Sequence, residues 1–181
     1  MLPMLVIVAL IALWFILSYN GLISSRNQVK NAWSQIDVQL KRRYDLIPNL
    51  VELVKDYMSY EQETLEKVIK ARQAAIEVSG VKAQAQAENQ LTASLRQLFA
   101  LAENYPQLKA NENVGKLQEE LTTTENKISF ARQHYNDSVM RYNTKLQTIP
   151  TNLIAGMFNF MPEEFFETAE AERGPVKVDL R

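Results

Sequence analysis

The sequence predicts an all-α protein, with a transmembrane helix at its N-terminus followed by an antiparallel up-and-down bundle of long helices. Three observations indicate this class. The first 23 residues of the 181-residue chain contain a long uncharged apolar run, and several long stretches between residues 24 and 148 carry apolar residues at steps of three and four, the spacing of one helix face. Only five glycines and six prolines are present, so few positions interrupt a helix.

Composition limits what the chain can do. Charged residues make up 23% and hydrophobic residues 46%, which is typical of a folded domain. A formal net charge of −1 gives no overall positive field that would gather nucleic acid. Cysteine is absent, which excludes disulfides, thiolate catalysis and cysteine metal sites.

Residues 1–23 are predicted to be a single-pass anchor. Leu2–Leu17 has no charged residue, and the run reaches the roughly 20 residues that cross a bilayer if it continues to Ile23. A cleaved signal peptide is the main alternative, but no basic residue precedes the run and no small-x-small site follows it. A buried core helix is the other alternative. The nearest cations, Arg26 and Lys30, follow the anchor, so the positive-inside rule predicts an external N-terminus and a cytoplasmic bundle.

Residues 24–150 are predicted to form the bundle, with helices at 24–78, 82–105 and 111–148. Pro48 lies inside the first helix and is expected to kink it, because proline removes one backbone hydrogen bond and clashes with the preceding turn. The third helix has the heptad spacing of a coiled coil. Short connections between long helices favour antiparallel neighbours.

Residues 151–181 are predicted to combine a short helix with a tail. Thr151–Met161 is apolar but too short to span a membrane, so we expect a helix that either docks on the bundle or lies at the bilayer surface. Pro162–Arg173 is acidic and is expected to be mobile. Val176–Leu180 alternates like a strand but has no obvious partner strand.

No catalytic or metal-binding motif is evident. The single histidine, His134, has Ala131 three residues before it, which excludes both the Glu-x-x-His pairs of a di-iron bundle and the two-histidine zinc protease motif. A catalytic triad would have to use His134, which the helical pattern places on a solvent-facing stretch, and no glycine-rich phosphate loop occurs. We therefore predict a protein that is not an enzyme and that binds no cofactor, metal ion, nucleic acid or small-molecule substrate.

Seven residues are candidate interaction or lipid-facing positions. A basic run in the first bundle helix would meet anionic lipid or a partner, although ion pairs of Lys41 with Asp37 or Asp45 are the simpler alternative. An upright helix would also hold Lys41 about 25 to 30 Å from the membrane. Two asparagines one heptad apart would either set the register of a helical seam or lie on its solvated flank. The seven are Lys41, Arg42, Arg43, Asn136, Asn143, Phe158 and Phe160.

Three long strings cover much of the soluble part. They are AWSQIDVQLKRRYDLIPNLVELVKDY at 32–57, LFALAENYPQLKANENVGKLQEEL at 98–121, and TENKISFARQHYNDSVMRYNTKLQTIPTNLIA at 124–155. In these strings the chain resembles the LemA family of bacterial membrane-associated proteins. The resemblance implies a four-helix bundle behind one transmembrane helix, in the bacterial cytoplasmic membrane, and a family without established enzymatic activity. One related group takes part in building the magnetosome membrane, which points to membrane organisation or scaffolding.

Three functional hypotheses follow. The first is a membrane-anchored helical scaffold that binds copies of itself or a membrane-associated protein, because one anchor and several amphipathic helices accompany no catalytic motif. The second is a transmembrane signalling module that relays a change through the helix kinked at Pro48. The third, a hydrolytic enzyme that depends on His134, is the least favoured.

Overall fold

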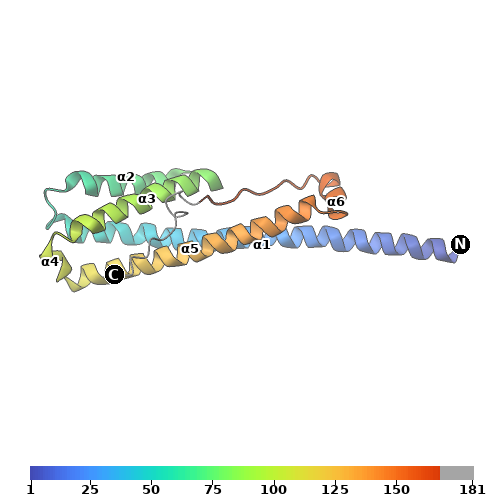
Figure 1. Ribbon diagram of the computed structural model, residues 1–181, viewed down its shortest axis with the longest axis horizontal. Coiled ribbons are helices and arrows are strands. Elements are labelled where there is room, and N and C mark those ends of the chain that lie inside the picture. The colour runs from blue at the N-terminus through green and yellow to red at the C-terminus, as the bar shows by residue number, and fades with distance from the viewer. Residues whose placement is uncertain (168–181) are drawn as a thin grey trace, which may run out of the picture. The chain divides into compact units, whose positions relative to one another are not determined.

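The computed structural model describes residues 1–167, and within this part of the chain the secondary structure is entirely helical (Figure 1). The helices are α1 Leu2–Lys55, α2 Gln62–Glu77, α3 Val81–Ala102, α4 Pro106–Lys109, α5 Glu112–Gln147 and α6 Thr151–Met157. The predicted all-α class is therefore confirmed. The chain divides into two compact units. The membrane-side unit combines Met1–Val38 with Ser129–Phe165, and the bundle unit combines Gln39–Ile128 with Phe166 and Glu167.

The predicted helix at 24–78 is wrong in its bounds. The apolar N-terminal run and the first bundle helix are one continuous helix, α1, which ends at Lys55. The backbone N–H of Met58 donates to the carbonyl of Val54 at 2.9 Å, and the Met58 side chain is fully buried. This buried methionine secures the turn that leads into α2.

Pro48 lies inside α1 without ending it. A proline has no N–H to give to the carbonyl four residues earlier, which here belongs to Tyr44. Arg72 of α2 donates from Nε to that carbonyl at 2.8 Å. A neighbouring helix thus supplies the bond that the proline removes.

The bundle unit is a four-helix arrangement in which the chain reverses direction from each long helix to the next (Figure 1). It uses the C-terminal part of α1, then α2, α3 and the N-terminal part of α5, with α4 in the last connection. Gly80 precedes α3 at φ +94°, a backbone conformation that favours glycine. The four long helices meet in one apolar core, which includes Ile47, Leu50, Val54, Leu65, Val68, Leu91, Leu98 and Leu121.

The membrane-side unit contains the N-terminal part of α1, the C-terminal part of α5, and α6. The ring of Trp33 on α1 contacts that of Tyr135 on α5 edge-on, with centroids 5.4 Å apart. Ile154 and Ala155 of α6 pack with the fully buried Leu22 of α1. The short segment predicted at 151–161 is therefore docked against α1.

The chain after α6 runs along α5 without regular structure, and we call residues 161–165 the strap. Tyr142 donates through its hydroxyl to the carbonyl of Met161 at 3.1 Å, and Asn143 exchanges two hydrogen bonds with the backbone of Glu163, at 2.9 and 3.0 Å. Within the tail Pro162–Arg173, which the sequence predicts to be mobile, the strap therefore has bonds to side chains of α5. Residues 168–173 and the strand-like Val176–Leu180 lie outside the described residues.

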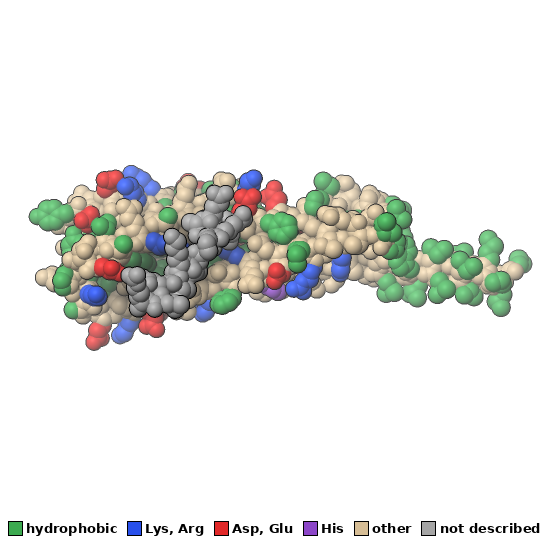
Figure 2. Space-filling model, in the orientation of Figure 1, with side chains coloured by type: hydrophobic (Ala, Val, Ile, Leu, Met, Phe, Trp, Pro, Cys, Tyr) green, Lys and Arg blue, Asp and Glu red, His purple; other side chains and the backbone are tan. Residues whose placement is uncertain are grey.

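One stretch of α1, near its N-terminus, is long and apolar enough to cross a membrane, and it is the one such stretch among residues 1–167. None of it is buried inside the protein. Figure 2 shows hydrophobic side chains around this end of α1. An uncharged helix with apolar side chains on every face is what a lipid environment requires.

Candidate functional site

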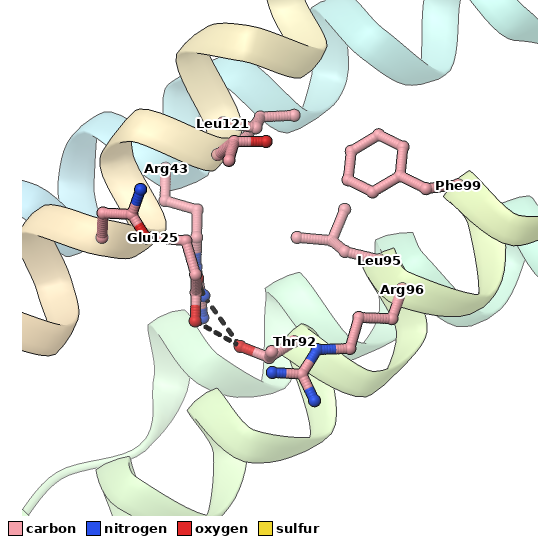
Figure 3. A pocket seen from close by; sticks show the side chains of 9 residues that line it. Arg43, Thr92, Leu95, Arg96, Phe99, Leu121 and Glu125 are labelled. Atoms are coloured by element: carbon pink, nitrogen blue, oxygen red, sulfur yellow. Dashed lines mark hydrogen bonds and ion pairs between the residues drawn. The ribbon is translucent and has the colours of Figure 1, made fainter. Parts of the chain in front are cut away.

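A polar interior site lies in the bundle unit, around Arg43 of α1 (Figure 3). The Arg43 side chain is fully buried and forms ion pairs with Glu88 of α3 and Glu125 of α5. Its Nη1 also donates to the hydroxyl of Thr92 at 2.9 Å, and Thr92 donates to Glu125 at 3.2 Å. One guanidinium therefore joins three helices.

The carboxylate of Glu88 has further donors. Tyr44 donates its hydroxyl proton to Glu88, and the Gln84 amide donates to the same carboxylate at 2.9 Å. Burial, and then the hydrogen bond to Glu88, raises the pKa of the Tyr44 hydroxyl well above its usual value. Tyr44 is consequently a neutral donor at any physiological pH, and the buried carboxylate is held by several donors at once.

The charged groups of this cluster are paired with one another. Two carboxylates contact one guanidinium, and the exposed fraction is 1% for the Arg43 side chain and 0% for that of Glu88. An isolated charge in such a place costs several kcal/mol. Because each long helix of the cluster needs the others to satisfy its polar groups, the cluster specifies how the helices align.

A cavity of about 170 Å³ borders the cluster. Figure 3 shows Arg43, Glu125 and Leu121 on one side of this space and Leu95 and Phe99 of α3 across from them. Thr92 is bonded to Arg43 and Glu125 at its lower end. The remaining lining residues are Arg96, Thr122 and Asn126. The volume is below the roughly 300 to 1,000 Å³ of ordinary ligand pockets.

The lining residues do not form a catalytic arrangement. A guanidinium does not release its proton in a protein, and Glu125 and Thr92 are bonded to Arg43 and to each other. No pair among the lining residues combines a nucleophile with an activating base in the manner of a triad. Residues 1–167 also contain no group of three or more His, Asp or Glu side chains that could hold a metal ion. The geometry therefore favours a structural role for this cluster.

The structure separates the basic run that the sequence singled out. Lys41 and Arg42 are exposed, and Arg42 pairs with Glu120 at 3.4 Å. Arg43 is fully buried, which removes it from any surface patch that could meet lipid or a partner. The two remaining cations are too few to form a strong basic surface next to Glu120.

The other predicted positions lie in the membrane-side unit. Asn136 and Asn143 are half-buried, and Asn143 holds the strap through Glu163. Phe158 is 48% exposed, and Phe160 is half-buried with its ring centroid 5.9 Å from that of Tyr19. His134 is exposed on α5, as its helical position predicted.

Sequence reasoning missed the acidic and hydroxyl partners of Arg43, namely Glu88, Thr92 and Glu125, and also the support that Arg72 gives to α1. A usable signal was present for Glu88. It lies three residues before the buried Leu91 and therefore on the core side of α3. A charged residue in that position indicates a buried partner.

Comparisons with known proteins agree with this architecture. The family model described as LemA family matches residues 32–180. The chain is 27% identical over 161 residues to Protein LemA of Metamycoplasma hominis, an alignment that covers 88% of this chain and 73% of that protein. It is 22% identical over 196 positions to Magnetosome protein MamQ 2 of Paramagnetospirillum magneticum, covering 94% and 72%. It is 21% identical over 187 positions to Magnetosome protein MamQ of Magnetospirillum gryphiswaldense, covering 89% and 69%.

Proposed function

Because the chain belongs to the LemA family, we propose that it is a scaffold. In this proposal the apolar end of α1 anchors the protein in a bacterial cytoplasmic membrane, and the bundle unit binds other helices. These helices belong to a second copy of the chain or to a membrane-associated partner protein. The protein carries out no reaction of its own.

The observation that carries this proposal is an apolar pair on the outer surface of α2. Ile69 and Ile76 are 48% and 44% exposed and are seven residues apart, so they lie on the same face of the helix. Gln73, also exposed, lies between them. Such a pair offers the contacts that one further helix needs for packing.

Two further observations support a non-enzymatic role. The cavity beside Arg43 is small, and the groups that line it are engaged in holding helices together. Two of the relatives are named magnetosome proteins. A role in organising membranes or membrane proteins is consistent with both observations.

Cross-linking in membranes tests the scaffold. The chain has no cysteine, so Gln73→Cys places a single thiol between Ile69 and Ile76. We expect this variant to form a disulfide dimer or a thiol-specific cross-link to one partner protein. Lys67→Cys is the matched control, because a position two residues before Ile69 faces the opposite side of the helix. Monomer alone from both variants would contradict the proposal.

Thiol labelling tests the proposed orientation. Gln86 is exposed on α3, so Gln86→Cys presents an accessible thiol on the bundle unit. With the bundle in the cytoplasm, a membrane-impermeant maleimide labels this variant only after the cells are lysed. Labelling of intact cells would place the bundle outside the cytoplasm and direct the search for partners to the envelope.

A further inference from the structure

Residues 149–161 present an unusually apolar surface, and we call this segment the collar. The exposed fraction is 84% for Ile149, 63% for Leu153, 71% for Met157, 48% for Phe158 and 64% for Met161. No charged residue occurs anywhere from position 148 to 162. A water-facing helix of a bundle would carry charged residues on its outer side, so this surface needs another explanation.

The collar is held against the end of the apolar run of α1. The ring centroid of Phe158 lies 5.9 Å from that of Phe15 and 4.8 Å from that of Tyr19. Phe160 approaches Tyr19 as well. In Figure 2 the hydrophobic side chains around the N-terminal part of α1 continue as far as α6. The exposed apolar surface of the collar is therefore continuous with the surface of the membrane-spanning stretch.

The composition of α1 explains what such a segment could do. The continuously apolar part, Leu2–Leu17, has 16 residues, which rise about 24 Å at about 1.5 Å per residue, so a crossing of the roughly 30 Å hydrocarbon core also uses the turn that follows. Ser18, Tyr19 and Asn20 follow and give the next turn a partly polar surface. The collar covers α1 at this turn and presents apolar side chains outward.

Two cations lie a short way beyond this turn of α1. Lys145 lies beside α1, with its Nζ 2.6 Å from the hydroxyl of Ser25, and Arg26 is exposed one residue further along. An apolar band with aromatic residues at its edge and cations beyond is the order found at a membrane surface.

We propose that the collar is embedded in the lipid bilayer, in the leaflet nearest the bundle. Leu153, Met157 and Phe158 enter the boundary between head groups and acyl chains, where they add apolar surface beside the partly polar turn of α1 at Ser18–Asn20. The partner is the lipid itself and not another protein, because the collar surface continues that of the transmembrane stretch. The proposal depends on the anchor and not on the scaffold role.

Fluorescence quenching in vesicles tests the collar. The full chain with Met157→Cys is labelled with an environment-sensitive fluorophore and reconstituted in phosphatidylethanolamine and phosphatidylglycerol vesicles that contain a nitroxide-labelled phospholipid. Leu10→Cys, within the anchor, is the reference for a lipid-embedded position. Phe130→Cys is the matched control, because Phe130 is a 73% exposed aromatic residue of the same unit, on α5.

We expect quenching of the probe at position 157 to be comparable to that at position 10, with little quenching at position 130. An unquenched probe at position 157 beside a quenched probe at position 10 overturns the proposal. If the emission of that unquenched probe at 157 is also blue-shifted, a protein, such as a second copy, covers the collar in place of lipid. Equal quenching at 130 also overturns it, because the lipid contact would then be general adsorption. If the probe at 10 is not quenched either, the proposal fails with its premise. Far-UV circular dichroism checks that the labelled variants are folded.

Discussion

Replacing Arg72 by methionine should lower the stability of the protein, because it removes a hydrogen bond from α2 to a backbone carbonyl of α1. The methionine keeps the apolar part of the side chain but cannot donate to the carbonyl of Tyr44, which Arg72 reaches at 2.8 Å. Pro48 leaves this carbonyl without a donor from its own helix. A hydrogen bond from a charged donor contributes about 1.5 to 3 kcal/mol. Since Arg72 is only half-buried, we expect a loss at the lower end of that range.

The dependence on Pro48 gives the prediction its specificity. Pro48→Ala restores an N–H that can donate to the Tyr44 carbonyl within α1, so Arg72→Met should cost much less in the P48A background. The coupling free energy between the two positions should be about 1 kcal/mol.

The same variant bears on the second functional hypothesis, a signalling module. If α1 relays a signal through a kink at Pro48, P48A should change the signalling response of the cell while the protein stays folded.

Thermal unfolding of four full-length proteins in detergent micelles measures this coupling. These are the wild type, R72M, P48A and the double variant, followed by far-UV circular dichroism. A loss of about 1.5 kcal/mol corresponds to a fall of about 3 to 6 °C in Tm for a chain of this size. Lys70→Met is the control, because Lys70 forms an exposed ion pair with Glu66, worth about 0.3 to 0.5 kcal/mol. Equal effects of R72M with and without Pro48 would refute the reasoning.

Three further outcomes are expected. Arg43→Met should lower the free energy of unfolding by about 3 to 5 kcal/mol, because it leaves Glu88 buried without its cation. Adding Glu88→Leu should restore much of this loss. Denaturant titration of the single and the double variant measures both effects. Asn143→Ala removes two hydrogen bonds to Glu163 and should make the strap cleavable by limited proteolysis while α5 stays protected. Burial, and then the nearby carboxylates of the strap, raises the pKa of Tyr135 to about 12. The folded protein therefore keeps this proton above pH 10 where the unfolded chain loses it, so stability is complete below pH 10 and falls between about pH 10 and 12. Tyr135→Phe should make that fall shallower in stability measured against pH.

The bounds of the first helix show what periodicity can and cannot reveal. Steps of three and four continue from Val54 to Met58, so the pattern gives no sign that α1 ends at Lys55. Met58 is buried although it lies in the turn after α1, and a core residue in a turn can have the same spacing as one in a helix. The fold class depends on the pattern as a whole and was predictable, whereas this reversal depends on a few local contacts.

The buried cluster was only partly predictable. Arg43 falls three residues after Leu40 and four before Ile47, both of which are buried, so the apolar spacing places it on the core face of α1. Glu88 occupies a similar position on α3. Two opposite charges on two core faces indicate a buried pair, but that they meet depends on how the helices align. The strap gave no comparable signal, because its bonds to Tyr142 and Asn143 use backbone atoms.

The polar contacts of Arg43 select one alignment of the bundle helices, which the apolar stripes of this chain cannot do. A helix with apolar residues at steps of three and four can slide by one heptad against its neighbour and still bury a similar surface. The guanidinium of Arg43 reaches Glu88, Thr92 and Glu125 in one alignment of the bundle unit. Any other alignment leaves a charge buried without a partner, which costs several kcal/mol. The R43M/E88L pair therefore separates two properties, since it can retain stability while it removes the contact that selects the alignment. If that contact fixes the fold, the double variant should show broadened NMR resonances for the bundle unit even where its Tm is unchanged.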